Sequence, residues 1–173
     1  MMTRVGAGMT PRSIPRQPRR PRTLKVGRYA QIDRERHRRV GVPEIILGEG
    51  KTVDHLMGIL RALHADRTGA LVSRPTEGQR RAIRAAARDG LPIRLLAEGR
   101  VARLAGPLGV RLSRAPVALL AAGTSDVPVA EETRAILEAF GAHVLTAYDV
   151  GVAGIHRLTR ALARIEARAP RAY

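Results

Sequence analysis

The sequence predicts an α/β protein, in which a small N-terminal α/β module precedes the first strand, helix, strand and helix of a doubly wound parallel sheet of the Rossmann-like kind. Two observations support this fold class. Short apolar runs alternate with helix-forming segments between residues 44 and 104. A continuous apolar run at 116–122 then opens a second series of the same alternation, as expected of a strand buried on both faces.

Composition and charge restrict the class of protein. The net charge of the 173 residues is +16, and residues 1–40 hold twelve basic residues against two acidic ones, so the chain attracts the phosphates of nucleotides or nucleic acid. The absence of cysteine excludes disulfides, cysteine-ligated zinc and thiolate nucleophiles within these residues. No run approaches the roughly 18 apolar residues that span a membrane, and no apolar segment follows the basic N-terminus. We therefore expect a cytoplasmic protein with no membrane contact.

Residues 1–27 are predicted to form a disordered basic tail. Prolines that prevent a helix recur there every three or four positions between arginines, at Pro11, Pro15, Pro18 and Pro21. Residues 28–39 have a helix-forming and highly charged composition, and Gly41 and Pro43 are expected to end that helix. The α/β module that begins at residue 28 is expected to continue to residue 104.

The other elements of this module follow from apolar periodicity and capping residues. Thr52 is placed to cap a helix with apolar residues at helical spacing, and Gly90 is placed to end a basic helix with an alanine-rich face. The expected strands are 44–47, 70–73, 92–97 and 101–104, and the expected helices are 53–65 and 76–88. Gly106, Pro107 and Gly109 then indicate a linker over residues 105–115.

The second unit, residues 116–173, contains the clearest pattern of the sequence. Its expected elements are a strand at 116–122, a helix at 128–140, a strand at 143–148 and a basic amphipathic helix that ends near residue 168. Glu131 and Glu132 are expected in the first turn of the first of these helices, where the helix dipole favours acids. Each strand leads into a loop whose residue types are those of a ligand site.

The first loop, GTSD at 123–126, lies at the carboxyl edge of the expected sheet, where doubly wound folds bind ligands. Gly123 permits close approach of a ligand, Thr124 and Ser125 offer hydroxyls, and the free N–H groups of the next helix suit a phosphate. Asp126 would oppose a phosphate unless it takes a ribose hydroxyl, a metal or an arginine. On local physics alone, the alternative that Ser125 and Asp126 only cap the helix is equally strong.

The second loop, DVGVAGIHR at 149–157, opens on the same edge of the sheet. Gly151 and Gly154 permit tight turns, and His156 and Arg157 lie near the start of the following helix. Histidine is a general acid or base near neutral pH, and arginine binds phosphate bidentately. Such a pair at a helix start is most often structural, but its position on the ligand edge favours a functional interpretation. We expect Ser125 and His156 to face a common pocket.

Three segments together resemble one known family. AAGTSDVPVAEET, YDVGVAGIHRL and YAQIDRERHRRVGVPEIILGEGKT resemble the nickel-pincer cofactor biosynthesis family LarB, which carries a domain related to the AIR carboxylase (PurE) of purine synthesis. The resemblance covers residues 28–168 and is loose at 74–114. It implies a PurE-type sheet for residues 116–173, truncated because a GMEGALP-like loop and an attacking cysteine of the family are missing.

The resemblance implies a specific reaction. LarB-type enzymes carboxylate the pyridinium ring of nicotinic acid adenine dinucleotide, with carbon dioxide or bicarbonate as co-substrate, and hydrolyse its phosphoanhydride to release AMP. Ser125 and Asp126 would hold the ribose-phosphate part, and His156 and Arg157 would line the carboxylation pocket. The implied substrate- and phosphate-binding residues are Gly123, Thr124, Ser125, Asp126, Gly154 and Arg157, with His156 catalytic. The family also implies a homo-oligomer and no covalently bound cofactor. We assign no residue as a metal ligand, and a requirement for Mg²⁺ stays open.

Two other functions stay open at this point. An AIR carboxylase or mutase of de novo purine (IMP) biosynthesis would share the loops, although the long N-terminal module and the GIHR residues argue against it. A basic nucleic-acid-binding protein would need stacking aromatics in its basic surface, and one Phe and three Tyr supply almost none. Because the attacking cysteine of the family is absent, we expect these residues alone to have no carboxylase activity.

Overall fold

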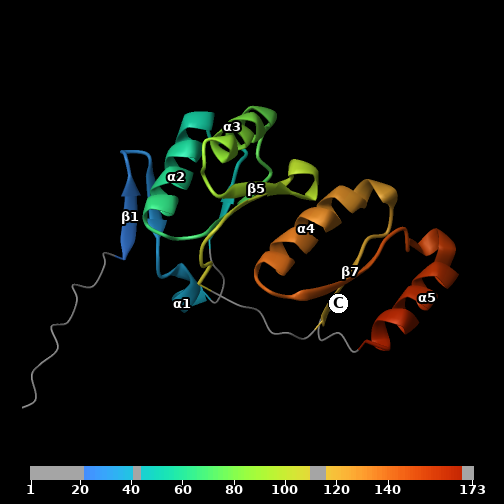
Figure 1. Cartoon of the computed structure of the whole chain (residues 1–173). Coiled ribbons are helices and arrows are strands. Elements are labelled where there is room, and N and C mark those ends of the chain that lie inside the picture. Colours follow the sequence, from blue (N-terminus) through green and yellow to red (C-terminus); the bar gives the residue numbers. More distant parts are fainter. Residues whose placement is uncertain (1–21, 41–43, 110–115, 169–173) are drawn as a thin grey trace, which may run out of the picture.

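Two sheets organise the protein, whose computed structural model describes residues 22–40, 44–109 and 116–168 (Figure 1). The first sheet has four strands in the order β3-β4-β6-β5, and the second pairs β7 with β8. Both sheets contain a parallel pair of strands, and helices lie against them. The architecture is therefore mixed α/β with a Rossmann-like partial sheet, as the sequence predicts.

A β-hairpin, rather than a helix, occupies the start of the described chain. β1 (Thr23–Val26) pairs antiparallel with β2 (Ala30–Asp33), and α1 is confined to Arg36–Val40. The prediction of a helix over 28–39 is therefore wrong. The physical reason is an apolar residue at every second position, which dense charge obscured. These residues pack against the core of the first half: Leu24, Val26, Ala30 and Ile32.

The hairpin also changes the boundary of the predicted N-terminal tail. Residues 23–26 belong to β1, and Val26 is buried, so the tail predicted for residues 1–27 is wrong over its last part. Gly27 takes a φ of 53° at the turn, in the left-handed region that favours glycine. The rest of that prediction, and those for residues 110–115 and 169–173, concern residues outside the described ranges.

The four-stranded sheet is built from strands that the sequence located to within one residue. β3 (Ile45–Leu47) and β4 (Ala70–Ser73) run parallel, whereas β6 (Val101–Leu104) lies antiparallel to β4 and to β5 (Ile93–Leu96). All four residues of β4 are buried because this strand is internal to the sheet and covered on both faces. The side chains of β4 and β6 therefore alternate between two separate apolar clusters.

Two helices, α2 (Val53–Ala65) and α3 (Glu77–Arg88), cover one face of this sheet (Figure 1). Thr52 accepts a hydrogen bond from the His55 N–H at 3.2 Å and caps α2 as predicted, and Thr76 forms a capping box on α3. The core beneath them is aliphatic, and its completely buried side chains are Leu56, Leu60, Val72, Ile83, Ala102 and Leu104. Burial of this apolar surface is the main favourable term in folding of the first half.

The second half has the predicted order of strand, helix, strand and helix. β7 (Pro116–Leu120) and β8 (His143–Ala147) are parallel neighbours, joined through α4 (Val127–Ala139) and followed by α5 (Ile155–Glu166). β7 is shorter than predicted, and four of its five residues are only partly buried. The reason is that each strand of this described pair has one strand neighbour, so the sheet is too narrow to bury both faces completely.

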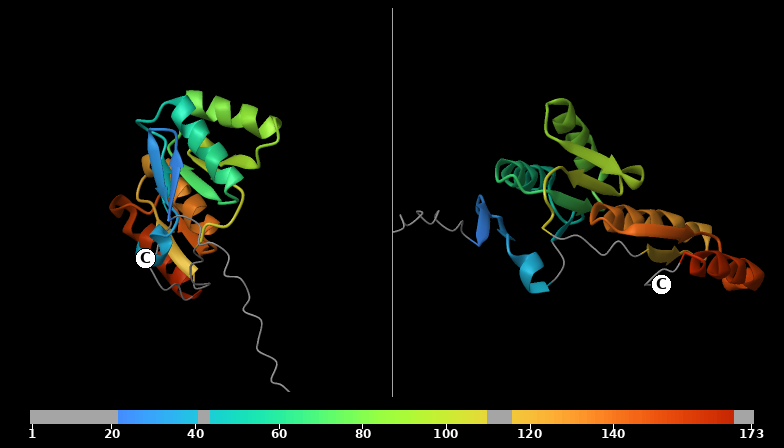
Figure 2. Two further views of the ribbon diagram at one scale, coloured as in Figure 1. Left: turned by 90° about the vertical axis from the view of Figure 1, so that its left-hand side faces the viewer. Right: turned by 60° about the horizontal axis from the view of Figure 1, so that its bottom comes forward.

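α4 packs against both sheets and joins the two halves (Figures 1 and 2). Phe140, directly after α4, is 4% exposed and packs with Leu71 and Val101 on the face of the first sheet opposite α2 and α3. α4 begins at Val127, so the prediction that Glu131 and Glu132 lie in its first turn is wrong. Both acids fall in the second turn, where they contact side chains rather than the helix terminus.

Candidate functional site

The two predicted ligand loops meet at the carboxyl end of the second sheet. The Gly151 N–H donates to the Ala122 carbonyl at 2.9 Å, and the Val150 N–H donates to the Ala121 carbonyl at 3.2 Å. Gly151 lies so close that a Cβ there would approach the Ala122 oxygen to 3.0 Å. The loop after β7 and the loop after β8 thus form one edge, as expected of parallel strands.

Asp126 organises the first loop. Its carboxylate accepts a hydrogen bond from the Gly123 N–H at 3.2 Å, and its own N–H donates to the Gly123 carbonyl at 3.1 Å. The side chains of Thr124, Ser125 and Asp126 are exposed. Within the described ranges, the Thr124 and Ser125 hydroxyls make no hydrogen bond. Asp126 therefore holds the turn closed, while two hydroxyls beside it stay available to a ligand.

Asp149 and Arg157 tie the second loop together. Asp149 has a φ of 55°, uncommon for a residue other than glycine, at the point where the chain leaves β8. Its carboxylate pairs with the guanidinium of Arg157, which lies on the first turn of α5. A Cβ on Gly154 would overlap the Arg157 side chain, so any larger residue there would displace the guanidinium from the loop.

Ser125 and His156 both lie on exposed turns at the ligand edge, one before α4 and one at the start of α5. Neither side chain makes a hydrogen bond within the described part of the chain. Neither residue lines the depression beside Arg157. The structure thus brings the two loops together through their backbones, and a pocket shared by Ser125 and His156 stays a prediction.

Basic residues line the depression beside the second loop, which has a volume of about 400 Å³. Arg157, Arg160 and Arg164 recur at three- and four-residue spacing and so share one face of α5. Asp149 pairs with Arg157, whereas Arg160 and Arg164 have no acidic partner within the described residues. The site edge is therefore positively charged, which suits the phosphates of a nucleotide.

Sequence reasoning missed a contact that fixes the start of the second loop. The Tyr148 hydroxyl, next after β8, donates to the Glu131 carboxylate on α4, which also accepts from the Arg134 Nε at 3.0 Å. The hydrogen bonds from Arg134 and Tyr148 lower the pKa of Glu131. Partial burial and the contact with Glu131 raise the pKa of Tyr148. No local signal identifies this pair, because its members belong to different elements.

We expect Tyr148→Phe to lower the free energy of unfolding by about 1 kcal/mol near neutral pH, because it removes one hydrogen bond to a carboxylate. The pKa of Glu131 lies below its ordinary value of 4.5 in the folded protein, so the stabilisation is complete above that pH and is lost as the pH falls through the folded-state pKa. Urea unfolding should show a difference from the unsubstituted protein that shrinks as the pH falls below 4.5. A pH-independent difference would contradict a role for the ionised carboxylate.

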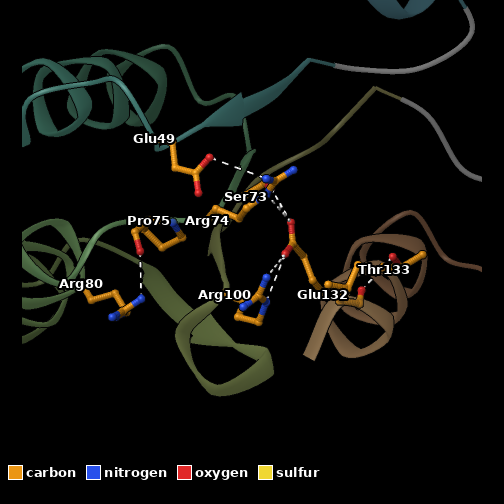
Figure 3. A network of polar contacts seen from close by, with 9 residues as sticks. Glu49, Ser73, Arg74, Pro75, Arg80, Arg100, Glu132 and Thr133 are labelled. Carbon is orange, nitrogen blue, oxygen red and sulfur yellow. Dashed lines mark hydrogen bonds and ion pairs between the residues drawn. The ribbon is translucent and has the colours of Figure 1, made fainter. Parts of the chain in front are cut away.

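A second network of polar contacts, which the sequence does not predict, is centred on Glu132 and connects α4 to the first sheet (Figure 3). The buried Glu132 carboxylate accepts hydrogen bonds from the Ser73 hydroxyl at 2.5 Å and from the Arg100 Nε at 3.2 Å. Arg74 lies 3.6 Å from Glu132 and 3.6 Å from Glu49, which is in the turn after β3. Arg74 thus contacts both this turn and α4, the helix that follows the first ligand loop.

Among the described residues, no group of three or more His, Asp or Glu side chains could hold a metal ion. No helix in those ranges is both long enough and apolar enough to cross a membrane.

Comparison with known proteins identifies the first half of the chain. Residues 23–104 match the LarB/PurE-like N-terminal domain, from the start of β1 to the end of β6. An uncharacterized protein of Methanocaldococcus jannaschii is 34% identical over 137 residues, which is 78% of this chain and 54% of that protein. The chain thus spans about half the length of this curated relative, and the similarity extends beyond the N-terminal domain. Residues 23–104 therefore form a LarB/PurE-like N-terminal domain, and this match supports a LarB-like family assignment for the chain.

Proposed function

We propose that the protein acts in nickel-pincer nucleotide cofactor biosynthesis, on nicotinic acid adenine dinucleotide. The family suggests an enzyme. In the proposed reaction, carbon dioxide adds one carboxyl group to the pyridinium ring in place of a ring proton, and water opens the phosphoanhydride to release AMP. The observation that carries the proposal is the joined pair of loops at the carboxyl edge of the second sheet, where Gly151 contacts Ala122.

The first loop is assigned the ribose-phosphate part of the dinucleotide. Asp126 has one carboxylate oxygen engaged with the Gly123 N–H, and its exposed carboxylate can accept a hydrogen bond from a ribose hydroxyl. Thr124 and Ser125 have exposed hydroxyls that can donate to phosphate oxygens. In this assignment Asp126 contacts the uncharged ribose and the hydroxyls contact the phosphate. The Asp126 carboxylate therefore does not face the negative charge of the ligand.

The second loop is assigned the reacting end of the substrate. His156 is exposed on the first turn of α5 and can take up the proton that leaves the ring. Arg157 lies over Gly154, and its five N–H groups are enough to keep the contact with Asp149 while they bind a carboxylate or phosphate. Arg160 and Arg164 extend the same positive face for the phosphoanhydride.

Calorimetric titration of the purified chain tests this assignment. We expect nicotinic acid adenine dinucleotide to bind, and Arg157→Ala to weaken its binding by about tenfold or more, because a charged hydrogen-bonding group is removed. Arg168→Ala is the matched control, since it removes the same charge from an exposed position after the end of α5. Tighter binding of aminoimidazole ribonucleotide than of the dinucleotide would instead favour the purine-synthesis alternative.

The same protein tests the chemistry. Because the 173 residues contain no cysteine, we expect no AMP release from the dinucleotide in the presence of bicarbonate, even where binding is measured. AMP release that His156→Ala abolishes would overturn this expectation and would identify a different route to ring activation. Equal loss of binding in Arg157→Ala and Arg168→Ala would contradict the placement of the substrate on the second loop.

A further inference from the structure

Two arginines stand opposite each other in the first sheet, away from the ligand loops. Arg94 on β5 and Arg103 on β6 are direct partners in the antiparallel register. They alternate along their strands with Ile93 and Leu104, which belong to the core beneath α2 and α3. Both guanidinium groups therefore project from the opposite face of the sheet. Like charges at directly opposed positions destabilise an antiparallel pair, so the arrangement requires an explanation.

No acid of this chain offsets the two charges. All fifteen Asp and Glu residues lie within the described ranges, and none of them pairs with Arg94 or Arg103. Elsewhere in the first half, arginines such as Arg34, Arg80 and Arg100 each have a carboxylate partner. The Arg94–Arg103 pair is thus an uncompensated concentration of positive charge in the described structure.

One guanidinium nitrogen of Arg103 is buried and has no hydrogen-bond acceptor in the described structure. Its Nη2 donates to the Gly106 carbonyl at 2.7 Å, whereas its Nη1 is buried and has no hydrogen-bond partner in the described structure. Gly69 packs so closely that a Cβ there would lie 2.8 Å from this Nη1. Burial, followed by the charge of Arg94, lowers the pKa of Arg103. A charged donor left in this state destabilises the protein unless a ligand satisfies it.

A cavity of about 540 Å³ adjoins the pair and opens to solvent at the edge of the sheet. Arg94 and Arg103 are its charged lining residues, and Leu91, Pro92 and Ile93 supply an apolar side. The volume falls within the range of small-molecule sites, which is roughly 300–1,000 Å³. The cavity can therefore hold a small anion together with an organic group.

We propose that Arg94 and Arg103 form a binding site for a phosphoryl group, carried by a small phosphate monoester or by free phosphate. A phosphate with two negative charges accepts hydrogen bonds from both guanidinium groups and removes their mutual repulsion. The site lies on the first sheet, while Asp126 and Arg157 belong to the loops of the second sheet, so it is independent of the proposed function.

Thermal unfolding and amide NMR of the whole chain test the site, with inorganic phosphate and AMP as separate probes. Potassium chloride at matched ionic strength serves as the reference, because phosphate also screens charges. We expect phosphate to raise the unfolding midpoint saturably and to shift the amide signals of Arg94, Arg103 and Gly106. Binding of AMP at least as tight as that of phosphate at these residues would identify a monoester as the ligand, and binding of phosphate alone would identify the free ion.

Glutamine variants locate the effect. Arg94→Gln and Arg103→Gln should each weaken phosphate binding by about tenfold or more. Without phosphate, Arg94→Gln should raise the unfolding midpoint, since like-charge repulsion is relieved. Arg81→Gln, at an exposed position of α3, is the matched control and should leave binding unchanged. An undiminished phosphate response in the double variant, an equal response to chloride, or NMR shifts confined to residues 123–126 and 149–157 would overturn the proposal.

Discussion

Replacement of Glu132 by alanine is expected to lower the free energy of unfolding by about 3 kcal/mol, because it removes a buried carboxylate that a buried hydroxyl and two partly exposed arginines contact. Glu132 is 7% exposed, and Ser73, Arg74 and Arg100 converge on its carboxylate. The Arg100 side chain is 35% exposed, so its charge would lose its partner where water screens it incompletely. The loss acts where the two halves meet, since Ser73 and Arg100 belong to the first half and Glu132 to α4.

Urea unfolding measures this effect, and Glu138→Ala is its matched control. Glu138 lies on the same helix but pairs with Arg134 at the surface, 3.5 Å away, so its removal should cost less than about 1 kcal/mol. Glu132→Leu combined with Arg100→Leu removes both charges while it keeps apolar bulk, and should recover most of the stability. A similar cost for Glu132→Ala and Glu138→Ala would show that the network does not hold the halves together.

Most elements were predictable because their signals are local. Thr52 caps a helix whose apolar residues recur at helical spacing, and the internal strand at 70–73 is a short apolar run that ends at Ser73. The helix predicted for residues 28–39 was wrong because the structure there depends on contacts that are distant in the sequence. Leu24 and Ile32 become inward-facing only when a hairpin packs on the core of the first half, and charge density is no guide to that contact. Tertiary packing there overrides composition.

Topology located the candidate site, but its contacts could not be predicted. Loops that follow parallel strands must share an edge, and for this reason the sequence identified both 123–126 and 149–157. The role of Glu132 depends on Ser73, which lies 59 positions earlier and on another sheet. The surroundings of the Arg103 guanidinium likewise depend on Gly69, which packs against its Nη1, and on Gly106, whose carbonyl accepts from its Nη2. Contacts at such separations leave no periodicity in a single sequence.

Phe140→Ala is expected to destabilise the protein by about 3–5 kcal/mol, the usual cost of deleting a buried aromatic side chain. Phe140 is the single Phe of the chain and is 4% exposed. Its partners Leu71 and Val101 lie on the first sheet, so the cavity would open between the two halves. In a core that is otherwise aliphatic, no neighbouring aromatic side chain is available to refill the space.

Two further variants serve as comparisons when urea unfolding is used to measure the destabilisation by Phe140→Ala. Phe140→Leu keeps part of the apolar volume and should lose less stability than Phe140→Ala. Val129→Ala, on α4 at a position 56% exposed, should cost less than about 1 kcal/mol. The apparent affinity for the dinucleotide should fall only in proportion to the fraction of unfolded protein. The reason is that the first ligand loop lies at the other end of α4. If Phe140→Ala were as mild as Val129→Ala, the contact between α4 and the first sheet would not stabilise the fold. The two halves would then fold independently, and the coupling through Glu132 would lose its structural basis.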